Sequence, residues 1–187
     1  MSEKPSIHRY IPALLAAAVA LIGAVYTLWG FEGEEADWTS LEQNLSDLSE
    51  AASLAEQVAV ADEDFAGCVA SKSANALVSS VSESVSSASD GVCTIPAVDV
   101  DVSQCIAWKD TTPEGVDVPS TVQLAVSPVL LLAKGALNHA SDESLKNWGS
   151  AVVDWLSSGQ ESVVALIEQP EGGTLSFESV TVENCKP

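Results

Sequence analysis

Residues 65–105 read FAGCVASKSANALVSSVSESVSSASDGVCTIPAVDVDVSQC, and their pattern decides the fold. Apolar residues recur at helical spacing up to residue 88, which predicts an amphipathic helix whose other faces are mostly serine. Asp90-Gly91 then predicts a turn. Within residues 94–102, Val98, Val100 and Val102 alternate with Asp99 and Asp101, which is typical of a strand with one solvated face. The chain therefore runs out along a helix and returns along a strand.

The lengths of these two elements restrict how the four cysteines pair. Cys68, Cys93, Cys105 and Cys185 are an even number, which indicates two disulfides in an oxidising compartment. A helix over residues 70–88 separates its ends by roughly 28 Å, whereas the five residues that lead to Cys93 span at most about 17 Å. Cys93 therefore cannot return to Cys68, but a nine-residue strand of roughly 30 Å brings Cys105 there. If a final strand pairs antiparallel with this one, Cys185 lies beside Cys93. We expect the bonds Cys68–Cys105 and Cys93–Cys185.

Upstream, residues 39–60 predict a second helix that packs against the first. Thr39-Ser40-Leu41-Glu42 has the form of a capping box. The apolar stripe that follows consists of Leu41, Leu45, Leu48, Ala52 and Ala55. We expect the two helices to form an antiparallel hairpin with a seam lined by alanine.

Downstream, residues 109–120 predict a loop, and Ser127-Pro128 predicts a helix start, with proline in the first turn. Residues 129–137 are apolar on nearly all sides, so we expect this helix to be the most buried. Further segments predict a helix from residue 141, a short helix over residues 160–169 and a strand over residues 174–183.

The predicted fold class is α+β: a helical hairpin and further helices packed on a small antiparallel sheet, with residues 116–126 as a candidate third strand. The predicted organisation is a cytoplasmic stub (1–10), a transmembrane anchor (11–30), an acidic tether (31–38) and an acidic extracytoplasmic domain (39–187).

The anchor prediction rests on residues 11–29, IPALLAAAVALIGAVYTLW, which are 19 residues without a charge. As a helix they measure roughly 28 Å, close to the thickness of the hydrocarbon core. The large apolar side chains of this anchor are Ile11, Leu14, Leu15, Leu21, Ile22, Val25 and Trp29.

Charges on either side of this segment orient it. Lys4 and Arg9 precede it and an acidic run follows it, so the positive-inside rule places the N-terminus in the cytoplasm. We expect a single-pass signal-anchor in the cell (inner) membrane, with the main domain periplasmic or extracellular. The alternative is a cleaved signal peptide. Its apolar region would be shorter, and a small-x-small cleavage site is missing after the run.

The chain has 27 acidic and seven basic residues, a formal net charge of −20. Such a surface repels nucleic acid, so we expect no nucleic-acid partner. The acidity either serves solvation, which a saline medium would favour, or attracts a basic protein or a cation. We favour solvation.

Sequence patterns of catalysis and metal binding are weak. His139 is followed by Asp142, but no G-x-S-x-G elbow occurs, so His139 is better explained as a residue at a helix C-terminus. The cysteines form no C-x-x-C pair. Asp62-Glu63-Asp64 and Asp99-x-Asp101 offer oxygen ligands for calcium but match no calcium loop. We predict no enzyme activity, no metal and no cofactor, and keep a hydrolase with a carboxylate pair as a minor alternative.

We expect a non-catalytic, membrane-anchored accessory or structural subunit of a larger membrane or envelope assembly, with protein partners. The alternative is a tethered binding module for a small ligand or cation between Trp108 and the face formed by Trp148 and Trp155. The sequence identifies no particular small-molecule ligand. Trp148 and Trp155 are candidate partner contacts, although as core residues they need no further explanation.

Overall fold

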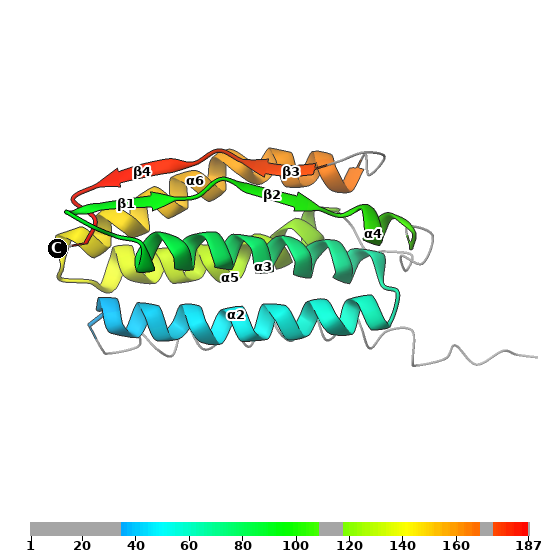
Figure 1. The fold of residues 1–187 in the computed structure, drawn as a ribbon, viewed down its shortest axis with the longest axis horizontal. Coiled ribbons are helices and arrows are strands. Elements are labelled where there is room, and N and C mark those ends of the chain that lie inside the picture. Colours follow the sequence, from blue (N-terminus) through cyan, green and yellow to red (C-terminus); the bar gives the residue numbers. More distant parts are fainter. Residues whose placement is uncertain (1–34, 109–117, 169–173, 187) are drawn as a thin grey trace, which may run out of the picture.

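The computed structural model describes residues 35–108, 118–168 and 174–186. The elements in chain order are α2 (Trp38–Ala61), α3 (Phe65–Ser86), β1 (Val92–Ile95), β2 (Val98–Asp101), α4 (Ser103–Ile106), α5 (Val118–His139), α6 (Glu143–Glu168), β3 (Thr174–Phe177) and β4 (Val180–Glu183). The fold is α+β. In Figure 1, α2 lies on one side of α3 and the strands lie on the opposite side. Strands β1 and β2 contact α3, and strands β3 and β4 contact α6.

Helices α2 and α3 form the predicted hairpin, but α2 begins earlier than expected. Its N-cap is Asp37, whose carboxylate accepts a hydrogen bond of 2.7 Å from the backbone N–H of Ser40. The Ser40 hydroxyl bonds back to the N-cap, so the capping box is Asp37 with Ser40. The predicted box of Thr39 with Glu42 is wrong, because aspartate caps a helix as well as threonine does and a serine at N3 can close the box.

Helix α3 is the central helix of the core. It packs on α2, α5, β1 and β2, and its buried residues run from Phe65 to Val85. Residues 129–137 of α5 were expected to be the most buried, but Lys134 there is exposed and several of its leucines are only half-buried. The serines of α3 allow this close packing because they are small. Some also bond to nearby carbonyls, as Ser71 Oγ does to Gly67 O at 2.7 Å, whereas the buried Ser73 Oγ has no partner among the described residues.

Each predicted strand is two short strands with an interruption. β1 pairs antiparallel with β4, and β2 pairs antiparallel with β3, so the structure contains two two-stranded sheets in line. Pro96 lies at the interruption, where a residue without an N–H cannot continue the ladder. Its carbonyl instead accepts a hydrogen bond from Ser80 on α3 at 2.8 Å. The expected third strand over residues 116–126 is wrong, since α5 already begins at residue 118.

Two predicted helix boundaries do not occur. Pro128 lies inside α5 and is buried there, although proline removes one helical hydrogen bond. Helix α6 continues through Gly159, where a second short helix was expected. The glycine is required by packing: a Cβ at this position would overlap the ring of Phe177 on β3.

No helix in the described ranges is long and apolar enough to cross a membrane. The predicted anchor, residues 11–29, and most of the tether lie outside those ranges.

Gly159→Ala tests the close approach of Phe177. We expect it to lower the free energy of unfolding by about 1–3 kcal/mol, because the added methyl group must displace the ring. Urea unfolding followed by circular dichroism measures this. In a Phe177→Ala background the same change should cost little or even stabilise, since alanine has the better helix propensity. An equal loss in both backgrounds would contradict the packing explanation.

Candidate functional site

The structure contains the two expected disulfides. Cys68 on α3 is bonded to Cys105 on α4, with Cα atoms 5.7 Å apart. Cys93 on β1 is bonded to Cys185 after β4, with Cα atoms 5.6 Å apart. The strand pairs β1–β4 and β2–β3 follow one another in a row that we call the strand ribbon, and the two bonds lie at its opposite ends. They confirm the pairing derived from element lengths. They indicate an oxidising, extracytoplasmic location.

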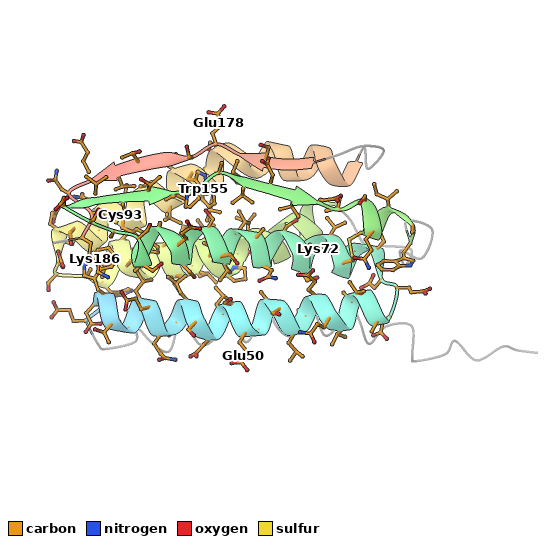
Figure 2. The ribbon with its side chains drawn as sticks, in the orientation of Figure 1. Glu50, Lys72, Cys93, Trp155, Glu178 and Lys186 are labelled. Carbon is orange, nitrogen blue, oxygen red and sulfur yellow. A yellow bond between two sulfur atoms is a disulfide. The ribbon has the colours of Figure 1, made fainter. Side chains whose placement is uncertain are left out.

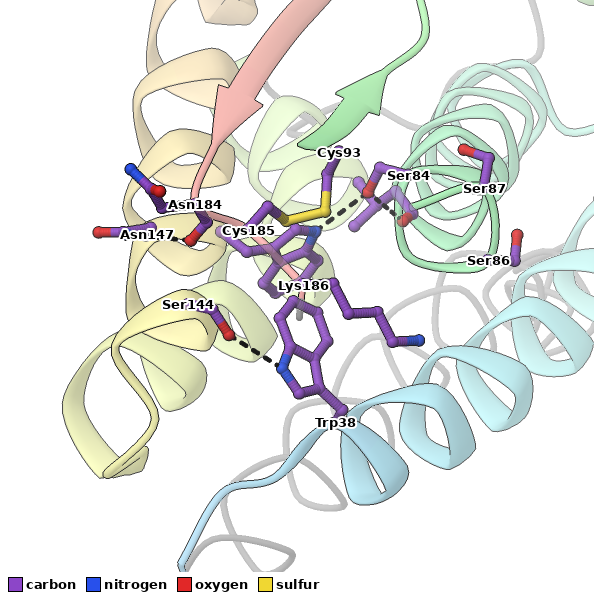
Figure 3. Close-up of a disulfide and its surroundings, with 12 residues drawn as sticks. Trp38, Ser84, Ser86, Ser87, Cys93, Ser144, Asn147, Asn184, Cys185 and Lys186 are labelled. Atoms are coloured by element: carbon purple, nitrogen blue, oxygen red, sulfur yellow. Dashed lines mark hydrogen bonds between the residues drawn. A yellow bond between two sulfur atoms is a disulfide. The ribbon is translucent and has the colours of Figure 1, made fainter. Parts of the chain in front are cut away.

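At the end that carries Cys93–Cys185, the first described residues are bound to the rest of the domain (Figure 3). We call this region the N-terminal docking cluster and define it as Ala36, Trp38, Asp142, Ser144, Trp148 and Lys186. Ala36 is only 2% exposed, forms a β-bridge with Ala140 and donates a backbone hydrogen bond of 3.1 Å to His139 O. The chain is thus fixed to the α5–α6 turn from residue 36 onward.

Trp38 is the centre of this cluster. Its indole N–H is shared between Asp142 Oδ2 and Ser144 Oγ, each at 3.2 Å. Its ring meets that of Trp148 edge-on, with centroids 6.4 Å apart, an arrangement that aromatic quadrupoles favour. Lys186 Nζ lies 5.6 Å from the Trp38 ring centroid, at the distance of a cation–π contact.

Lys186 also connects the cluster to α2. Its Nζ is 2.7 Å from Glu42 Oε1, so the residue predicted to close the capping box instead binds the C-terminal segment. The N-terminal segment, the α5–α6 turn and the C-terminal segment therefore meet in one place. The sequence signal for this was faint: a tryptophan next to a helix cap does not reveal its partners 104 and 106 residues away.

Trp148 and Trp155 are core residues. Trp148 is fully buried, and its indole N–H donates to Ser84 Oγ at 3.0 Å. Trp155 is 3% exposed, donates to Glu178 O at 2.9 Å and packs on Phe177 with ring centroids 4.9 Å apart. The core interpretation is confirmed, because the chain itself encloses both indoles. A partner contact at Trp148 and Trp155 stays a prediction.

The alternative hypothesis of a ligand site between Trp108 and these tryptophans stays a prediction. Trp108 follows α4, at the end of the domain away from the N-terminal docking cluster (Figure 1). Trp148 lies at the cluster itself, against Trp38. Trp155 packs instead on Phe177.

The two acidic runs that offer oxygen ligands for calcium lie in separate parts of the fold. Asp62 and Glu63 are exposed at the α2–α3 turn, whereas Asp64 is buried. Asp99 and Asp101 lie on the solvated face of β2, as the alternation predicts. Within the described ranges, no group of three or more acidic, histidine or cysteine side chains could hold a metal ion.

His139 occupies the position expected for it, the last turn of α5. Its carbonyl accepts the hydrogen bond from Ala36, so this residue contributes to the docking of the N-terminal segment through its backbone.

Asp142 and Asp64 have opposite electrostatic environments. The Ser144 hydroxyl, 2.8 Å from Asp142 Oδ1, lowers the pKa of Asp142 below its usual range. Burial raises the pKa of Asp64, and the charge of Asp62 adds to this effect, while the nearby backbone of Gly67 and Ala66 opposes it. Asp64 Oδ2 is buried without a hydrogen-bond partner and lies against Gly67. The first carboxylate stabilises the fold when ionised, and the second costs stability when ionised.

Asp142→Asn tests the docking cluster through its pH dependence. A depressed pKa contributes stability that is present above the unfolded-state value of about 3.9 and is lost as the pH falls through the folded-state value. We therefore expect the variant to be less stable than wild type at pH 7 and equal to it at the acid end of the folded range, by urea unfolding. Ser144→Ala removes the donor and should weaken the same dependence. A stability difference that does not change with pH would contradict this role.

Asp64→Asn should act in the opposite direction. Because the folded-state pKa is raised, the ionised group destabilises the fold at pH 7, and this penalty disappears as the pH falls toward the unfolded-state value. We expect the variant to be more stable at pH 7 by roughly 1–2 kcal/mol, because the amide keeps the shape of the carboxyl group but carries no charge to desolvate. Asp62→Asn, at the exposed neighbour, should give a smaller gain. A loss of stability in Asp64→Asn at pH 7 would show that the carboxylate acts as a cap.

Comparisons of this chain with protein-family models, with curated proteins and with solved structures found no match. The functional argument below therefore depends on the chemistry and the placement of this chain's own residues.

Proposed function

We propose that this protein is a non-catalytic accessory or structural subunit of a membrane or envelope assembly. Residues 11–29 span the cell membrane once, the N-terminus is cytoplasmic, and the disulfide-bonded domain lies on the periplasmic or extracellular side. The observation that carries the proposal is the order along the chain: 19 uncharged residues are followed, after a short acidic tether, by a domain with two disulfides. Export across the membrane explains both features, because the uncharged segment can span the bilayer and disulfides form on its oxidising side.

The contacts of the domain support a structural role. Trp38, Asp142 and Lys186 join segments that are distant in the sequence. Lys72 joins α3 to α2 within the hairpin, since its Nζ is 3.2 Å from Glu56 Oε1. Asn75 also donates to Glu56, at 2.9 Å. These polar contacts join α2 to α3, to the α5–α6 turn and to the C-terminal segment.

The surface of the domain favours protein partners over nucleic acid. Acidic side chains project from opposite sides of the domain, as Glu50 and Glu178 do in Figure 2. Within the bilayer, the predicted anchor offers small residues that allow a neighbouring helix to come close. These residues are Ala13, Ala16, Ala17, Ala20, Gly23 and Ala24. A partner subunit could therefore meet the anchor and the domain together.

The test is to extract the tagged full-length protein from its native membrane in mild detergent and to capture it under non-reducing conditions. We expect the wild type to stay in the membrane pellet after an alkaline wash and to be captured with stoichiometric protein partners. Leu21→Arg, which places a charge at the centre of the predicted span, should fail to reach the pellet, since this costs about 3 kcal/mol. Release of the wild type by alkali, or migration as a monomer alone, would refute the proposal.

A further inference from the structure

We infer that the domain stands end-on above the membrane, with the N-terminal docking cluster facing the lipid headgroups and the α2–α3 turn pointing away. This inference rests on the proposed function, because it takes residues 11–29 as the anchor. It adds which end and which sides of the domain a partner can reach.

The first step is that the free part of the tether is short. Ala36 is buried and bound to the α5–α6 turn, so the chain is part of the rigid domain from that residue onward. Only six residues, 30–35, separate it from the end of the uncharged segment. Six extended residues reach about 20 Å. The end of the domain that carries Ala36 must therefore remain within that distance of the membrane surface.

The second step is that the domain is longer than this tether. Helix α2 begins beside Ala36 and runs the length of the domain for 24 residues, which is about 36 Å. The α2–α3 turn, α4 and the Cys68–Cys105 bond lie at its far end (Figure 1). These parts come close to lipid only if the domain lies on its side.

The third step is that the described residues on the long sides of the domain offer little that would bind these sides to a bilayer. A domain that rests on a bilayer buries an apolar face in the interface and benefits from basic residues around it. Among the described residues, the exposed large hydrophobic side chains are Leu54 on α2 and Val92 on β1, which are single and on different elements. Around them, Asp47 and Glu50 are exposed on α2, and Asp99 is exposed on the ribbon. Such sides are repelled by anionic headgroups.

The orientation decides which surfaces face the membrane. The long sides of α2 and of the strand ribbon run along the membrane normal, and the α2–α3 turn and α4 are presented away from the membrane.

The experiment measures the distance from the membrane surface at three positions along α2. Its residues Gln43, Glu50 and Gln57 are all exposed and follow one another at intervals of seven, so each step along the helix is about 10 Å. All four natural cysteines are in disulfides, so a single added cysteine at each position can be labelled without reduction. The full-length variants Gln43→Cys, Glu50→Cys and Gln57→Cys are reconstituted in vesicles that carry a headgroup-attached energy-transfer acceptor.

We expect energy transfer to fall in the order Gln43→Cys, Glu50→Cys, Gln57→Cys. Trp38→Ala, which loosens the docking cluster, should raise the transfer at Gln57→Cys because the domain can then tilt. If the protein floats with the vesicles but the three positions give equal transfer, or the order is reversed, the end-on orientation is overturned while the anchor stands. If the protein does not float with the vesicles, the anchor is wrong and the orientation is overturned with it.

Discussion

The structure depends on one constraint: the chain that leaves along α3 must return along it, and a disulfide holds each end of the return path. Cys68–Cys105 joins the start of α3 to the end of the return, and Cys93–Cys185 joins the start of the return to the last strand. A two-stranded ribbon is marginal in water without further support. The two disulfides close loops of 37 and 92 residues. By lowering the entropy of the unfolded chain, each stabilises the folded state by on the order of 4 kcal/mol. The ribbon can therefore remain flat on α3 and α6.

Close packing beneath the ribbon follows from the small side chains of α3. Serine in a helix is usually a solvent-facing residue, yet Ser71, Ser80 and Ser84 are buried. Each satisfies its hydroxyl with a carbonyl, and Ser84 in addition accepts the indole N–H of Trp148. The helix can thus approach its neighbours closely, while the carboxylates of the chain are placed on the outer faces. The same helices and strands form the compact core with their inner faces and carry the acidic side chains on their outer faces.

The two ends of the domain differ in character. One end is fastened by the N-terminal docking cluster, where aromatic, ionic and backbone contacts hold both ends of the described chain. The other end carries the α2–α3 turn, where Asp64 is buried beside Gly67 with one carboxylate oxygen unpartnered. Each end carries one disulfide, and the N-terminal docking cluster adds its contacts at the end next to the segment proposed as the anchor. In a membrane-tethered subunit, this arrangement would hold the docked end of the domain close to the anchor.

The sequence by itself determined what depends on local periodicity and on chain reach. The helical hairpin, the solvated aspartates of β2 and both disulfides follow from repeats of 3.6 and 2 residues and from the lengths of helix and strand. Only the tertiary structure decided the interruption at Pro96, the passage of α5 through Pro128, the continuity of α6 at Gly159 and the docking of Trp38. Three of these depend on a neighbour elsewhere in the sequence: Ser80 for Pro96, Phe177 for Gly159 and Asp142 for Trp38. A local pattern carries no information about such partners, because they meet only when the helices and strands have packed together.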